Sequence, residues 1–137
     1  MLENRLEEKQ EKLVKQQNKY RIIMKKINNK NKRRLRVRNK IKGTNERPRI
    51  SVRRSNQHII AQIINDESGE TLVGISTISL KDFKGTKSEQ SFELGKRIGN
   101  IASKKKIKKV VLDRGFSKYH GRVKQFAEGA REAGLEF

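Results

Sequence analysis

The chain has 137 residues, which predicts one domain, and its 35 lysines and arginines against 15 acidic residues give a net charge of +20. Such a charge attracts polyanions, and a hydrophobic content of 32% is too low to pack the whole length, so we expect part of the chain to be ordered only by a partner. The absence of cysteine excludes disulfides, thiolate catalysis and cysteine-ligated zinc. We find no apolar run long enough for a bilayer and no signal peptide, so we expect a soluble, cytoplasmic protein.

The first 29 residues are highly charged and predict a helix with a thin apolar stripe. Its glutamates precede most of its lysines, an order that suits the helix dipole. The side chains of the stripe recur every seven residues: Leu6, Leu13, Tyr20 and Ile27. A solvated helix is favoured, and the alternative is a helix docked on RNA or on a neighbouring protein. A stable isolated coiled coil is disfavoured because Lys9 and Gln16 interrupt the stripe.

A basic arm follows at residues 30–42, where no acidic residue occurs. A solvated charged run is the usual alternative for such a segment. Here no hydrophobic face and no nearby acid offset the charge, and a segment of this kind normally lies along phosphates. Residues 43–45 break the pattern, so we divide the chain into an N-terminal extension and arm at 1–46, ordered by RNA, and a globular RNA-binding domain at 47–137.

Residues 47–64 predict a β-hairpin, to which the rest of the domain is joined. Apolar and polar residues alternate from Ile50 onward, as in a half-buried strand, and the Ser-Asn pair at 55–56 supplies turn chemistry. The isoleucine-rich second half, residues 59–64, predicts a strand covered on both faces. A third strand is expected over 71–77, so that three strands form an antiparallel meander.

A helix should follow the meander. Thr86 and Glu89 fit a capping box, so this helix should begin there and end at the lysines of 104–106. We expect its two glycines, Gly95 and Gly99, to approach the sheet closely. Its apolar side is formed by Leu94, Ile98, Ile101 and Ala102.

Residues 107–112 predict a fourth strand, and the preceding helix makes its connection a crossover and its pairing parallel. A last helix should face the sheet with Val123, Phe126, Ala127, Ala130 and Ala133. Gly134 stands where a left-handed cap would end it. The predicted fold is therefore a small α/β domain in two or three layers. Its mixed sheet joins an antiparallel three-strand meander to a parallel strand, with two covering helices, after a basic N-terminal arm and helix.

The loop at 113–122 follows the end of a strand, where α/β folds bind ligands. We expect its arginines to contact phosphate or guanine and its rings to stack on an exposed base: Arg114, Arg122, Tyr119 and His120. The free amide groups of the next helix, which begins near Gly121, favour a phosphate. The alternative is a loop packed on its own core in which Asp113 pairs with Arg114.

The pattern does not support catalysis. Asp113 and His120 alone make no catalytic set, and no Walker or dinucleotide phosphate loop occurs. The strands carry almost no carboxylates for a metal-dependent nuclease, and two histidines, His58 and His120, are too few for zinc. We predict no enzyme activity, cofactor, metal or small-molecule substrate. The rival functions are an α/β nuclease acting on RNA and a basic protein on an anionic membrane, for which the N-terminal helix has too few bulky apolar residues.

Four separated stretches resemble one family. They are Lys-Ile-Lys-Gly-Thr-Asn-Glu-Arg-Pro-Arg-Ile-Ser-Val at 40–52, Arg-Ser-Asn-Gln-His-Ile-Ile-Ala-Gln at 54–62, Asp-Arg-Gly with Tyr-His-Gly-Arg-Val at 113–123, and Ala-Arg-Glu-Ala-Gly-Leu-Glu-Phe at 130–137. In this order they resemble the bacterial ribosomal protein family that binds 5S rRNA, number eighteen of the large subunit. Arg53 and Ile60 depart from it, since aromatic residues often stand there, and about thirty residues extend beyond its usual start.

The resemblance implies a structural protein of the large ribosomal subunit that grips 5S rRNA and helps attach it to 23S rRNA in the central protuberance, beside neighbouring ribosomal proteins. By position, it implies RNA contacts from the arm, the hairpin and the loop. The residues are Arg33, Arg34, Arg36, Arg38, Lys40 and Lys42 in the arm; Arg47, Arg49, Arg53, Arg54, Ser55, Asn56 and His58 in the hairpin; and Arg114, Tyr119, His120, Gly121 and Arg122 in the loop.

Overall fold

The computed structural model describes residues 2–25 and 29–137. Contacts between residues divide the chain into two compact units, one ending at Lys32 and one beginning at Arg33. Residues 33–46, assigned to the arm by sequence, therefore belong to the same compact unit as the globular domain. That RNA orders the arm stays a prediction.

The first unit contains helix α1 (Leu2–Lys25), the helix predicted from the charged N-terminal sequence. In its apolar stripe, Leu6 and Leu13 are exposed, whereas Ile27 and the Tyr20 side chain lie outside the described part of the chain. Helix α2 (Asn29–Lys40) carries most of the basic arm; it has no acidic residue in its first turn and no buried side chain. None of the side chains that the structure describes in these two helices therefore belongs to the hydrophobic core.

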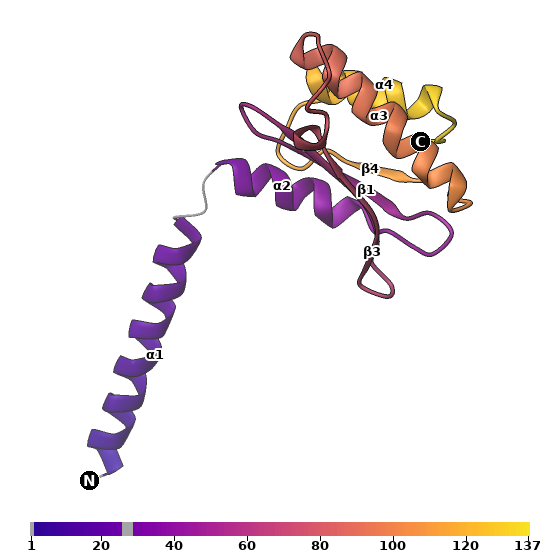
Figure 1. Cartoon of the computed structure of the whole chain (residues 1–137). Coiled ribbons are helices and arrows are strands. Elements are labelled where there is room, and N and C mark those ends of the chain that lie inside the picture. Colours follow the sequence, from indigo (N-terminus) through magenta and orange to yellow (C-terminus); the bar gives the residue numbers. More distant parts are fainter. Residues whose placement is uncertain (1, 26–28) are drawn as a thin grey trace. The chain divides into compact units, whose positions relative to one another are not determined.

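A four-stranded mixed sheet and two covering helices make up the second unit together with residues 33–46, and this confirms the predicted α/β class (Figure 1). The strands are β1 (Arg49–Arg54), β2 (Ile59–Asn65), β3 (Glu70–Ser76) and β4 (Val111–Asp113). Their order is β3-β2-β1-β4, with antiparallel pairs among the first three and a parallel pair between β1 and β4. A 3-10 turn, η1 (Thr77–Ser79), follows β3, and the helices are α3 (Lys87–Lys104) and α4 (Arg122–Glu132).

Helices α3 and α4 lie side by side on the same face of the sheet (Figure 1), which makes the expectation that β2 is covered on both faces wrong. Ile59, Ala61 and Ile63 are buried in the core, whereas Ile60 is 42% exposed. Side chains of a strand point alternately to the two faces of its sheet. The isoleucine run is therefore a half-buried strand that also carries apolar residues at outward positions.

The fourth strand is shorter than the predicted 107–112. Lys106 has a φ of 61°, a left-handed turn that follows α3 and delays the strand. The chain before β4 pairs with the C-terminal end instead, because Val110 N–H donates to Glu136 O at 3.1 Å and Glu136 N–H donates to Lys108 O at 2.8 Å. The first half of the predicted strand thus lies beside the end of the chain rather than beside β1.

The predicted helix ends are confirmed. Thr86 is the N-cap of α3 and forms a reciprocal capping box with Glu89. Gly134 follows α4 with a φ of 105°, and Leu135 after it is buried. The core side chains of the two helices are Leu94, Ile98 and Ala102 from α3, and Val123, Phe126, Ala127 and Ala130 from α4.

Glycines let the two helices meet backbone to backbone, which corrects the expectation that Gly95 and Gly99 approach the sheet. A Cβ added at Gly95 would collide with Phe126 O of α4, and one added at Gly129 would collide with Phe92 O of α3. Gly99 faces the side chain of α4's C-cap residue, Ala133. The glycines of each helix therefore accommodate the other helix.

Gly95→Ala should destabilise the domain by about 1–3 kcal/mol, the usual cost of overpacking, because the new methyl group would meet α4 backbone. The matched control is Gly74→Ala in β3, where nothing lies within 4 Å of an added Cβ. That change should be neutral or slightly stabilising, since glycine weakens a strand. Urea unfolding measures both, and equal midpoints would contradict the close packing of α3 on α4.

Candidate nucleic-acid interface

The tip of the β1–β2 hairpin lies beside the loop that leads into α4. Arg122 Nη2 donates to Ser55 O at 2.9 Å, and Lys87 Nζ at the start of α3 donates to Asn56 O at 2.8 Å. The tip itself is fixed, because Ser55 N–H donates to His58 O and His58 N–H donates to Ser55 Oγ, at 2.8 and 3.0 Å. The structure thus brings together two of the three segments predicted to contact RNA.

Uncompensated positive charge gathers where these two segments meet. Burial, and then repulsion from Arg54, lowers the pKa of the Arg122 guanidinium. Within the described ranges, no carboxylate forms an ion pair with either arginine. Arg53, Arg54, Ser55 and Asn56 are all exposed at the tip. An anion held between the tip and the loop would relieve the repulsion, so this place favours a phosphate.

The loop at 114–121 is shaped by its own bonds. Arg114 Nη1 donates to Ser117 O at 2.9 Å, so the alternative pairing of Arg114 with Asp113 does not form. Tyr119 is 38% exposed, and its hydroxyl accepts a hydrogen bond from Arg131 Nη1 at 2.9 Å. His120 is exposed beside it. Both rings are therefore accessible for stacking, while the Tyr119 ring is oriented by α4.

The N-terminus of α4 lies where the loop meets the hairpin tip. Its N-cap, Gly121, has a φ of 58° and makes no side-chain cap bond. The first amide groups of a helix point outward and carry partial positive charge, so they bind anions when no side chain occupies them. Gly121 thus joins the loop arginines and the hairpin tip in one anion-attracting region.

Arg49 differs from the other predicted contacts because it is buried, with only 6% of its surface exposed. Its Nε and Nη2 donate to the two oxygens of Asp66 at 3.0 and 3.1 Å, and its Nη1 donates to Asp113 Oδ2 at 2.8 Å. The bond from Arg49 holds the pKa of Asp66 at about 2, helped by a bond from Gly43 N–H. The guanidinium is therefore engaged with carboxylates of the protein.

The other predicted contacts lie nearer the surface. Arg47 is exposed and its Nε donates to Val110 O at 3.3 Å, whereas half-buried His58 shares a hydrogen bond of 3.1 Å with Thr77 Oγ1. Arg38 Nη1 lies 3.7 Å from Asp66 and 3.9 Å from Asp113, with a side chain 39% exposed. The remaining arm residues are exposed: Arg33, Arg34, Arg36, Lys40 and Lys42.

Sequence reasoning missed two residues of this region. Lys87 supports the hairpin tip, and its only sequence signal is its position directly after the N-cap Thr86. Asp66 accepts hydrogen bonds from Arg49 and from Gly43 N–H and forms an ion pair with Arg38. In the sequence it is only a polar residue of a predicted loop. A charge that pairs with residues 17 to 28 positions away leaves no local pattern.

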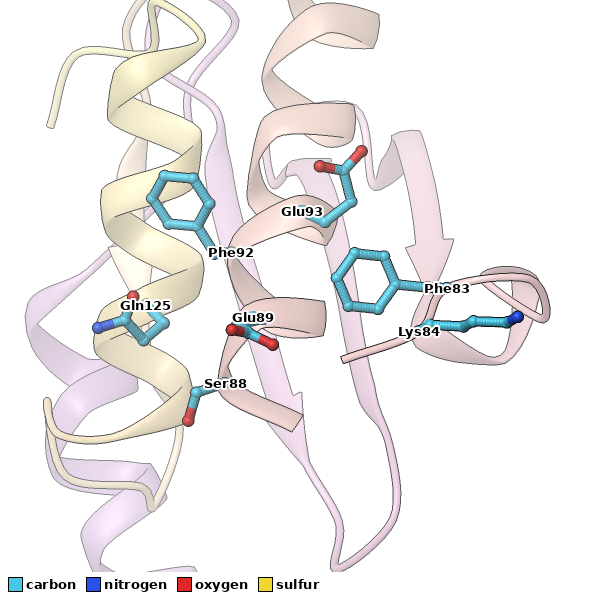
Figure 2. Close-up of a pocket in the computed structure, with 7 residues that line it drawn as sticks. All are labelled: Phe83, Lys84, Ser88, Glu89, Phe92, Glu93 and Gln125. Carbon is cyan, nitrogen blue, oxygen red and sulfur yellow. The ribbon is translucent and has the colours of Figure 1, made fainter. Parts of the chain in front are cut away.

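A separate groove lies on the helical layer, with a volume of about 720 Å³. Its lining residues are Phe83, Lys84, Ser88, Glu89, Phe92, Glu93 and Gln125, and Figure 2 shows the two rings on opposite sides of the first turns of α3. Glu89 and Glu93 bring two carboxylates against one lysine. That balance does not suit a polyanion, which leaves the groove outside the candidate interface.

The described residues contain no group of three or more acidic or histidine side chains that could hold a metal ion. None of the helices within those same ranges is long and apolar enough to cross a membrane.

Comparisons with known proteins point to a ribosomal family. Residues 24–137 match the family described as "Ribosomal L18 of archaea, bacteria, mitoch. and chloroplast". A relative from Kosmotoga olearia, named "Large ribosomal subunit protein uL18", is 54% identical over 110 residues, which cover 77% of this chain and 90% of the relative. Proteins of the same name from Sorangium cellulosum and Clostridium botulinum are 50% identical over 117 residues (82% and 98% covered) and 56% identical over 108 residues (77% and 90% covered).

The depressed pKa of Asp66 predicts a pH effect. A carboxyl whose pKa is depressed in the folded state stabilises the fold above its unfolded pKa, and that contribution is lost as the pH falls through the folded value. Wild type should therefore exceed Asp66→Asn in stability near neutral pH, and the difference should shrink between pH 3.8 and about 2. Urea unfolding midpoints at a series of pH values measure it. A difference that stays constant down to pH 2 would contradict the depressed pKa of Asp66.

Proposed function

The chain belongs to the ribosomal L18 family and is a structural constituent of the large ribosomal subunit, and we propose that it binds 5S rRNA there and helps attach it to 23S rRNA in the central protuberance. A ribosomal protein of this kind binds RNA and is not an enzyme. In the bacteria from which the named relatives come, the ribosome is cytoplasmic. Neighbouring ribosomal proteins are its further partners.

The observation that most supports the RNA contact is the junction of hairpin tip and loop. Arg54 and Arg122 lie close together without a carboxylate partner in the described ranges, next to the open N-terminus of α4. Separately, each of these features would be a common surface detail. Together they give a fixed cluster of positive groups, which is what an RNA backbone recognises.

The proposed contacts divide by chemistry. The arm residues present long, exposed cations, which suit phosphates of any sequence. The loop presents Tyr119 and His120 beside arginines held in fixed directions, which suits a splayed base and its neighbouring phosphate. We do not include Arg49 among the proposed RNA contacts, because its guanidinium is buried and bonded to two carboxylates.

Affinity for 5S rRNA should fall steeply with salt, because each phosphate contact from the arm releases a counterion. A titration at several salt concentrations gives the slope of log K against log salt. With six to ten phosphates engaged, the loss between 50 and 200 mM salt should be roughly 10³- to 10⁵-fold. A nearly flat dependence would contradict contact between the arm and phosphates.

The loop and the arm should differ in specificity. Arg34→Ala with Arg36→Ala should weaken binding to 5S rRNA and to unrelated RNA alike. Tyr119→Ala should cost about 1–3 kcal/mol on 5S rRNA, the size of one stacked base, and much less on unrelated RNA. Binding titrations of each variant on both RNAs at fixed salt measure this.

The control is Arg97→Ala on an exposed part of α3, where the side chain pairs with Glu93 and lies outside the proposed contacts. This variant should bind like wild type. Circular dichroism checks the fold, and intact RNA after incubation in magnesium excludes a nuclease. Equal losses for Tyr119→Ala on both RNAs would reduce the loop to one more part of a basic surface.

A further inference from the structure

The ion pairs of the buried Arg49 join three segments of the second unit that are distant from one another in the sequence. We call Arg49, Asp66 and Asp113 the Arg49 cluster. Asp66 belongs to the loop between β2 and β3, and Asp113 ends β4 directly before the loop proposed to contact RNA. Arg49 lies at the start of β1 and bonds both carboxylates, while only 8% of its own side chain is exposed. Its guanidinium is therefore engaged within the protein, and it connects to elements that we propose to contact RNA.

The cluster also fixes the end of the arm. Gly43 N–H donates to Asp66 Oδ2 at 2.7 Å, the same oxygen that accepts from Arg49 Nε. The backbone of Gly43 lies so close to the sheet that an added Cβ would be 2.7 Å from both Arg49 N and Ile64 O. The chain thus leaves α2 through a point held against β1 and β2.

On its other side the cluster fixes the start of the loop. Asp113 Oδ2 accepts from Arg49, and its Oδ1 accepts from Gly115 N–H at 3.0 Å. Gly115 has a φ of 61°, so the loop turns sharply at this bond. One guanidinium therefore sits between the attachment of the arm and the first turn of the loop.

We propose that Arg49 is a positioning residue for RNA binding: by holding Asp66 and Asp113 together, it sets the direction in which the arm leaves the domain relative to the 114–122 loop. This inference rests on the proposed function, because it concerns how two proposed contact segments engage one RNA together. Two binding segments of one protein give a higher affinity than either segment alone only when both can contact the same RNA at the same time.

Arginine suits this position because of its shape. Its planar fork carries five N–H donors in fixed directions, and here each of its three nitrogens donates to one of two carboxylates. A lysine would keep the charge but present a single ammonium group, which cannot hold both carboxylates in the same geometry. The released carboxylate would then attract Arg38, whose Nη1 already lies 3.7 Å from Asp66 and 3.9 Å from Asp113. An arm cation would be drawn toward the protein instead of phosphate.

The test is a double-mutant cycle on 5S rRNA between Arg49→Lys and the arm pair Arg34→Ala with Arg36→Ala. In wild type, removing the two arm cations should lower affinity roughly tenfold, as expected for the loss of two phosphate contacts. In Arg49→Lys protein the same removal should cost only about twofold, because the arm no longer reaches the RNA correctly. The slope of affinity against salt should also be smaller for Arg49→Lys. Arg97→Lys, in an exposed ion pair of α3, is the control and should leave the cycle additive.

A residue that only supports the fold would lower the folded fraction and leave the two effects additive, so additivity in folded protein overturns the proposal. If Arg49→Lys does not fold, Gly43→Ala replaces it, because it disturbs the attachment of the arm and keeps the arginine. Non-additivity with the arm pair then supports the proposal and additivity overturns it. If wild type itself does not bind 5S rRNA, the proposed function fails. If wild type binds but the cycle is additive, only the role of Arg49 fails.

Discussion

The close contact between α3 and α4 organises the helical layer of the domain. Gly95 and Gly129 allow the two helix backbones to touch, so that both helices fit on one face of a four-stranded sheet. Their N-termini meet the hairpin tip, through Lys87 on one helix and Arg122 on the other. The starts of both helices therefore lie beside the hairpin tip.

A net charge of +20 must be carried by a chain with a small core. The structure keeps the apolar side chains in the core and nearly all of the charged side chains outside it. The described core is made of aliphatic residues and Phe126, and the only charged side chains buried there or beside it are those of Arg49 and Asp113, which pair with each other, while Arg49 also pairs with Asp66. Arg54 and Arg122 are left close together without a carboxylate partner in the described residues, and an anion bound between them would relieve their repulsion.

Local chemistry was enough to predict some of this arrangement. The capping box at Thr86 and the left-handed glycine at Gly134 depend on neighbours within four residues, so their sequence signals suffice. The face that Gly95 presents to α4 could not be predicted, because glycine spacing fits close packing on a helix and on a sheet equally. The burial of Arg49 could not be predicted either. Its partners lie 17 and 64 positions away, and an arginine in a basic hairpin has no local pattern that distinguishes it from an exposed arginine. The adjacency of Arg122 and Ser55 likewise exists only in three dimensions.

Salt weakens the interactions of the exposed arm cations more than the ion pairs of Arg49 inside the protein. Exposed charges are screened over about 10 Å at 0.1 M ionic strength, whereas buried pairs are screened much less. The arm cations face solvent, so their proposed attraction to phosphate should weaken first as salt rises. The bonds from Arg49 to Asp66 and Asp113 are largely sheltered, so the attachment of the arm and the first turn of the loop keep their arrangement after the RNA has dissociated. Under the proposed function, the sheltered ion pairs of Arg49 hold the attachment point of the arm, while the exposed cations provide the salt-sensitive part of the affinity.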